Sequence, residues 1–520
     1  VSVSGGGVTF PGSSSLALSG VGSSLAFSGV LAASFADSTL TVQDGTMSVS
    51  NSASATFTNT YAHIFGAGSV VLSNTAHLAL ENGTHVDIDT PLASVSFSDA
   101  SSMVVDTGAT FNVTDGSVTF TDQSTLQLST LSNFYVLGGS FVMRGTSSML
   151  ALPHSKGRIS GGALVVMEQA SLTFVSSDIV IDGAIQYTSS VPIRLLNGTA
   201  LVVNMAPITV GGGTLNINQY SSLEINGGSL NFINSAQLAA DSGLITVSSG
   251  SITVSDMSAF TATDNSTVIV SGGNLDASGQ AQVALTGASQ LTLSAGSVSL
   301  SGSSSLSASS SSSISVSGGQ LQLSDSSSAS LSTDATLSID SNVSLSGSST
   351  LSLSSGAALA ISHAGSLSLT DTSSISSTDA AQISLTGGNI ALSNSATGSF
   401  AGGSQVSISQ GGSLSIDSGS STAPAGVVFT GASQVSISGG GGVSLSGTSS
   451  SLQFQLATSL SLSNASAINL SGSSSLGFSG ASTANVTAGS FTVGGTSTLT
   501  IASDSTVSLA GGSSITVSNA

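Results

Sequence analysis

Few residues in this chain could take part in chemistry, and one group stands out by its spacing. His85, Asp87 and Asp89 occupy alternate positions with apolar residues between them, so on a β-strand all three side chains would share one face. One imidazole and two carboxylates at that spacing could form a surface cation site. Nothing nearby supplies an evident fourth ligand, so we interpret the group as the solvated face of a strand and predict no metal site.

The basic residues form a second candidate group. The chain has 24 acidic and 4 basic residues, a formal net charge of -20, and all its bases lie between residues 144 and 194. Glycine spacing becomes irregular there, which predicts loop excursions over about 144–228, with a second irregular segment over about 412–442. This patch is the first place to expect contact with a partner or a neighbouring molecule; the alternative is an ordinary coil with an exposed loop. Its residues are Arg144, Lys156, Arg158 and Arg194.

Catalytic and cofactor chemistry has little support elsewhere. Serine is so abundant that combinations of serine, histidine and aspartate arise by chance, and only geometry could single one out. The chain has no cysteine, which excludes a thiol nucleophile, a disulfide framework and a zinc finger. We therefore predict no catalytic residues, no cofactor and no enzymatic activity. The negative charge disfavours nucleic acid and anionic membranes as partners.

The elements that position these residues are indicated by the composition. Charged residues make up 5% of the chain and hydrophobic residues 39%, a combination that is not typical of disorder. Apolar and polar residues alternate with a period of two, which is typical of strands with one buried face. No apolar run is long enough to cross a bilayer as a helix, so we predict no membrane span.

The alternation repeats at a fixed interval. Gly250, Gly273, Gly296 and Gly319 are each 23 residues apart, with apolar residues at the second, fourth, tenth, twelfth, eighteenth and twentieth positions after each glycine. Three strand-sized segments per unit leave no room for a helix or a four-stranded blade. The sequence predicts an all-β fold, a single-stranded parallel β-helix (β-solenoid) continuous over residues 1–520. Each coil would have three short strands and a triangular section, with the right-handed winding usual for parallel crossovers. At about 4.8 Å per coil, roughly 22 coils would form a rod on the order of 100 Å long.

The outer surface and the corners of such a coil follow from the same repeat. Small hydroxyl side chains suit the outside, because stacked like charges would repel whereas hydroxyl groups can hydrogen-bond along the stack. Four aspartates lie six residues after a repeat glycine, and we interpret them as turn formers whose carboxylates accept bonds from nearby backbone N–H groups. A calcium or catalytic role is the alternative, but the calcium-binding nonapeptide motif is absent. The four are Asp122, Asp256, Asp325 and Asp371.

Carbohydrate is a candidate modification of this surface. N-x-S/T sequences mark eight asparagines as candidate N-glycosylation sites, a number that chance alone would produce. Outward serine and threonine rows could equally carry O-linked sugars. The candidate asparagines are Asn82, Asn112, Asn197, Asn265, Asn342, Asn464, Asn469 and Asn485.

The repeat resembles the β-solenoid stalks of large secreted repetitive proteins, namely autotransporter-type passengers, haemagglutinin-like adhesins and fibrous surface proteins. The resemblance covers nearly the whole chain and depends on alternating serine, glycine and aliphatic residues. GGAL at residues 161–164 also matches a motif of polymorphic outer-membrane passengers once, whereas their companion motif F-x-x-N is absent. The resemblance implies display outside the cell or at its surface as a spacer, an adhesin shaft or a self-assembled fibre.

The leading hypothesis is an extracellular structural protein that forms or extends a surface filament by end-to-end stacking of coils. Both ends lie inside the repeat pattern without a visible cap, which predicts either further coils in a longer chain or self-association end to end. Two alternatives stay open, a β-helix enzyme that acts on an extracellular polysaccharide and an ice-binding face. The first requires acids and bases gathered on one lateral face, and the second requires regular Thr-x-Thr ladders, which are a minority here.

Overall fold

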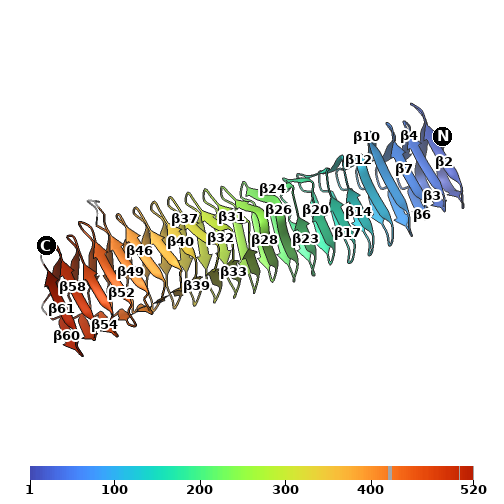
Figure 1. Cartoon of the computed structure of the whole chain (residues 1–520). Coiled ribbons are helices and arrows are strands. Elements are labelled where there is room, and N and C mark those ends of the chain that lie inside the picture. Colours follow the sequence, from blue (N-terminus) through green and yellow to red (C-terminus); the bar gives the residue numbers. More distant parts are fainter. Residues whose placement is uncertain (420–423, 503, 519–520) are drawn as a thin grey trace. The chain divides into compact units, whose positions relative to one another are not determined.

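The computed structural model describes residues 1–419, 424–502 and 504–518, and in these residues the chain is built from strands without a helix. The strands run from β1 (Ser2–Phe10) to β61 (Ser514–Ser518) and pair in parallel. This confirms the predicted parallel β-solenoid, with about 22 turns and a spacing of ~23 residues. The chain divides into two compact units, Val1–Thr253 (unit 1) and Val254–Ala520 (unit 2), and within each of them successive coils stack on one another (Figure 1).

Each coil contributes one strand to each of three faces. After Gly296, for example, β34 (Ser297–Leu300), β35 (Ser305–Ala308) and β36 (Ser313–Val316) complete one coil of unit 2. We name the three faces first, second and third in this order, and equivalent strands of other coils belong to the same face.

Every strand of this coil pairs with the strand three positions later in the chain. The partners are β37 (Gln320–Leu323), β38 (Ser328–Leu331) and β39 (Thr336–Ile339). The register sets Val298 beside Leu321 and Ile314 beside Leu337, so each aliphatic side chain lies over its equivalent in the next coil. Inward rows of this kind form the core, and all six predicted inward residues of this coil are buried: Val298, Leu300, Leu306, Ala308, Ile314 and Val316.

Aromatic side chains extend the same stacking in the core of unit 2. Phe400, Phe429, Phe454 and Phe478 end four successive strands of the second face, namely β47 (Thr397–Phe400), β50 (Gly426–Phe429), β53 (Ser451–Phe454) and β56 (Ser475–Phe478). Their ring centroids are 4.9, 5.2 and 5.0 Å apart, with interplanar angles of 19° or less. Parallel in-register pairing thus produces a stack of rings from a single repeated position.

Serine also lies inside the coil, which the sequence analysis did not predict. Ser304 and Ser312 occupy the two corners between the strands of one coil, and both are fully buried. The Oγ atom of Ser312 lies 2.7 Å from the carbonyl oxygen of Ser309 and 3.1 Å from that of Leu285 in the preceding coil. The hydroxyl therefore satisfies backbone acceptors at a corner inside the narrow section.

Consecutive coils approach closely at the third corner, which several coils fill with glycine. Gly296 has φ of +78°, and a Cβ atom built on it would lie 2.0 Å from the carbonyl oxygen of Gly273 one coil earlier. In unit 1, a Cβ on Gly139 would lie 2.0 Å from the carbonyl oxygen of Gly116. At Gly296 and Gly139 both the backbone conformation and the lack of space exclude a side chain.

The predicted corner aspartates adopt a left-handed conformation, and their carboxylates connect coils. Asp122, Asp256, Asp325 and Asp371 each have φ of 60°. The Oδ2 atom of Asp325 accepts a hydrogen bond from the Gly302 N–H at 2.9 Å, and that of Asp371 accepts one from the Gly347 N–H at 3.1 Å. Both donors lie one coil earlier, so these side chains bond to the neighbouring coil.

Residues 144–228, where we expected loop excursions, include successive strands from β16 (Ser148–Ala151) to β26 (Ser222–Ile233). The coil shortens from ~23 to 21 residues between Leu172 and Ile193, and the corners are shorter there while the strands keep their pairing. In the second irregular segment, the extra length lies between β49 (Ser413–Asp417) and β50, and residues 420–423 of that segment lie outside the described residues. The described part of the chain contains no helix that is long and apolar enough to cross a membrane.

Candidate functional site

The third face of unit 1 gathers outward aromatic, histidine, acidic and basic side chains on successive strands. Its successive strands are β7 (Tyr61–Phe65), β10 (His85–Phe97), β12 (Thr110–Phe120), β14 (Asn133–Val136), β17 (Lys156–Ile159) and β20 (Asp178–Ile181). We use the name polar-aromatic face for the outward residues Tyr61, His63, Phe65, His85, Asp87, Asp89, Asn112, Tyr135, Lys156 and Arg158.

Asp87 is the centre of a hydrogen-bond network on this face. His85, Asp87 and Asp89 all point outward from β10, as their alternation predicted. The Oδ2 atom of Asp87 accepts hydrogen bonds from Tyr61 Oη and, with the proton on that nitrogen, from His85 Nε2, each at 3.0 Å. Its Oδ1 atom accepts a bond of 2.7 Å from Asn112 Nδ2. One carboxylate therefore holds side chains from three consecutive coils.

Ring stacking reinforces this network. The rings of Tyr61 and His85 lie 5.7 Å apart at an interplanar angle of 5°, and those of His63 and Phe65 lie 4.5 Å apart. His63 Nε2 lies 3.1 Å from Asp89 Oδ2. Burial raises the pKa of Tyr61, and the hydrogen bond to Asp87 raises it further. At neutral pH the phenol therefore keeps the proton that it donates to Asp87.

The geometry does not fit a metal centre. Over the described ranges, no three histidine, aspartate or glutamate side chains converge on a point where a metal ion could bind. Asp87 and Asp89 instead use their oxygens as hydrogen-bond acceptors for neighbouring side chains. The group forms an ordered polar surface.

The four bases do not form one patch. Lys156 and Arg158 point outward from β17 on the polar-aromatic face, and Arg158 Nη2 forms an ion pair of 2.8 Å with Asp182 Oδ2. Arg194 points outward from β22 (Ile193–Leu196) on the second face, and Arg144 follows β15 (Ser140–Met143) at a corner. The structure thus brings two bases onto the same face as the histidine and aspartate group and places the other two elsewhere.

The candidate glycosylation sites differ in accessibility. Asn112 is partly buried, and its Nδ2 atom donates to Asp87 Oδ1 at 2.7 Å and to Thr114 Oγ1 at 3.2 Å. The amide nitrogen that would carry the sugar is therefore occupied at Asn112. The other seven side chains are exposed: Asn82, Asn197, Asn265, Asn342, Asn464, Asn469 and Asn485.

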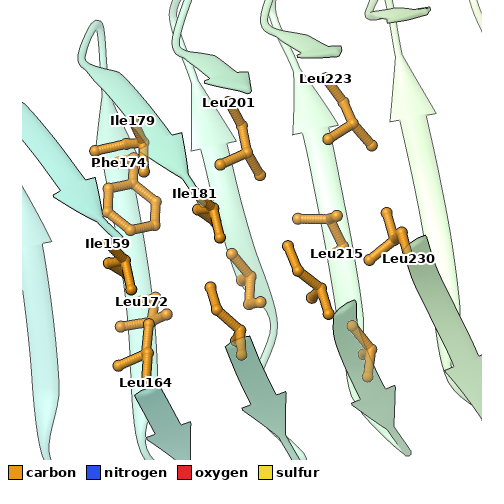
Figure 2. Close-up of a pocket in the computed structure, with 14 residues that line it drawn as sticks. Ile159, Leu164, Leu172, Phe174, Ile179, Ile181, Leu201, Leu215, Leu223 and Leu230 are labelled. Atoms are coloured by element: carbon orange, nitrogen blue, oxygen red, sulfur yellow. The ribbon is translucent and has the colours of Figure 1, made fainter. Parts of the chain in front are cut away.

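The core of unit 1 contains a small cavity that does not suit a ligand. Its volume is about 30 Å³, and Figure 2 shows Ile181, Leu201, Leu215 and other apolar side chains around it. A void of that size holds about one water molecule, and the purely apolar lining offers such a water no hydrogen-bond partner. The cavity is a packing gap between coils, not a binding site.

Sequence reasoning missed the partners of the predicted aspartates. Tyr61 and His63 occupy the positions of His85 and Asp87 one coil earlier, so applying the repeat to the N-terminal coils would have found them. Comparison with known proteins adds no family: no family model matches the chain, and no curated protein matches it.

Proposed function

We propose that this chain is a structural protein displayed outside the cell, where its coils act as a spacer or shaft. The observation that carries the proposal is the coil-on-coil parallel ladder within each unit. Strands such as β34, β35 and β36 bond to the coil before and the coil after. Repeated coils can change the length of such a protein without changing its section.

The composition of the outer surface supports the same role. Outward positions of the coil after Gly296 are all serine: Ser297, Ser299, Ser305, Ser307, Ser313 and Ser315. With 5% charged residues in the whole chain, like charges are seldom stacked in register along a face. A surface of uncharged hydroxyl groups avoids repulsion between stacked coils. It therefore suits a long shaft at the cell surface.

Addition of coils would also provide a route to a filament. The strands β59 (Thr498–Ile501), β60 (Thr506–Ala510) and β61 pair with the coil before them. Their opposite edges can accept another coil, either from the same polypeptide or from a second copy, because an open strand edge presents unpaired N–H and C=O groups. Filament growth by this route is part of the proposal.

Microscopy of the native cell surface tests the proposed function. Antibodies raised against the chain should label intact cells of the source organism, and electron microscopy should show the label on thin surface filaments. Labelling that requires permeabilised cells would contradict an extracellular role. Separate short particles at high concentration of the intact native chain would contradict filament formation.

A further inference from the structure

The polar-aromatic face carries opposite charges at two separate positions. Asp87 and Asp89 point outward from β10, whereas Lys156 and Arg158 point outward from β17. The strands β10, β12, β14 and β17 pair in that order, so the acidic and basic strands are three coils apart. At about 4.8 Å per coil, this separation is about 14 Å.

Asp89, Lys156 and Arg158 remain accessible for a further contact, whereas the side chain of Asp87 is only 18% exposed. The side chain of Asp89 is 49% exposed and that of Arg158 is 55% exposed. Arg158 forms an ion pair with Asp182 through Nη2. A guanidinium group has five N–H donors, so this ion pair leaves donors for a second carboxylate. Lys156, also exposed, adds a second positive charge on the same strand.

We propose that this face pairs with the same face of a second copy of the chain, with the coils of the two copies running in opposite directions. A twofold axis parallel to the strands, midway between β12 and β14, would set β10 of each copy against β17 of the other. The acidic strand then meets the basic strand twice, because a twofold interface repeats every contact. A parallel, in-register pairing would set Asp87 and Asp89 against their own equivalents, where like charges repel.

The neutral centre of the face fits the same arrangement. Asn112 on β12 and Tyr135 on β14 lie on either side of the axis, so each tyrosine ring would cover the asparagine of the other copy. Tyrosine is enriched at the centres of protein interfaces, where charged residues are depleted. In this pairing the aromatic and amide side chains occupy the centre, and the charges flank them.

The small area of the face indicates how tightly the two copies should bind. Five residues at ~3.3 Å and six coils at ~4.8 Å cover about 16 by 29 Å, or roughly 450 Å² per copy, below the ~800 Å² per partner of a standard interface. The association should therefore be weak and dependent on protein concentration. It should also weaken as salt is raised, because its charged contacts are partly exposed to solvent.

Sedimentation of the full chain over a range of concentrations, at low and high salt, tests the pairing. The double variants Lys156→Glu/Arg158→Glu and Asp87→Lys/Asp89→Lys should each reduce dimerisation at least about tenfold, because each turns both contacts into repulsions. An equimolar mixture of the two variants should restore dimers, since in a mixed pair every acidic strand again faces a basic one. Circular dichroism checks that each variant is folded.

Arg194→Glu supplies the matched control, since it reverses one charge on the second face and should leave dimerisation unchanged. A wild-type chain that stays monomeric at every concentration would overturn the proposal. A mixture that fails to restore dimers, or an Arg194→Glu variant as defective as the others, would overturn it as well.

Discussion

Replacement of Gly296 by alanine tests whether close approach of the coils sets the glycine spacing. A Cβ atom there would lie 2.0 Å from the carbonyl oxygen of Gly273, which also accepts a hydrogen bond of 3.2 Å from the Ser297 N–H. Relieving this overlap must separate the two coils at the corner. That separation weakens the hydrogen bond, at a cost of about 0.5–1.5 kcal/mol, and strains the packing by about 1–3 kcal/mol.

Gly403→Ala is the matched control for this variant. Gly403 has nearly the same φ, +77° against +78° at Gly296, but a Cβ atom on it would have no neighbour within 4 Å. Both variants share the cost of a left-handed alanine, about 1–2 kcal/mol, so the difference between them isolates the crowding. We expect Gly296→Ala to lower the free energy of unfolding by about 1.5–4.5 kcal/mol more than Gly403→Ala.

Chemical denaturation followed by circular dichroism measures this difference, and hydrogen exchange locates it. Exchange should accelerate more in the coils on either side of Gly296 in Gly296→Ala than around Gly403 in Gly403→Ala. Equal destabilisation by the two variants would refute the argument, because backbone conformation alone would then explain the glycine.

Other features of the structure lead to further predictions. Phe429→Ala should lower the free energy of unfolding by about 3–5 kcal/mol in denaturant titrations, because it removes the middle of a ring stack. Burial lowers the pKa of His77. As the pH falls below 6.5, His77 therefore takes up a proton more readily in the unfolded chain than in the folded chain. The free energy of unfolding of the wild type should decrease over this pH range, and His77→Gln should remove this contribution. Burial raises the pKa of Tyr187 to about 12 from 10.0, so stability should fall as the pH rises between these values, and Tyr187→Phe should abolish the effect. Mass spectrometry of chain made in a glycosylating host should find sugar at exposed asparagines such as Asn342 and none at Asn112; a modified Asn112 would contradict the observed hydrogen bonds.

The repeat made most of the coil predictable from the sequence. Period-two alternation identified the strands, and the glycine interval fixed the register, because both depend on backbone geometry that every coil shares. The buried corner serines were missed because serine was assigned to the outside by its polarity. Their signal was present: Ser304 and Ser312 lie eight and sixteen residues after Gly296, and Ser258 and Ser266 lie at the same positions after Gly250.

The candidate site was less predictable, because its contacts join coils. His85, Asp87 and Asp89 were identified from one strand, whereas Tyr61 and Asn112 come from the coils before and after it. Side-chain hydrogen bonds between coils depend on rotamers that composition and spacing do not determine. The four bases were grouped because they lie close in sequence, between residues 144 and 194. A segment of that length forms strands on all three faces of the solenoid, so the bases point in different directions.

The parallel ladder determines how the protein would respond to mechanical force. Pulling on one end opposes the hydrogen bonds of a single terminal coil at a time, since every other coil keeps both neighbours. Release of one coil of ~23 residues would free about 78 Å of extended chain at ~3.4 Å per residue, while the stack shortens by only ~4.8 Å. A tether built in this way would yield in successive steps of about 70 Å, dissipating work at each one before the polypeptide is fully extended.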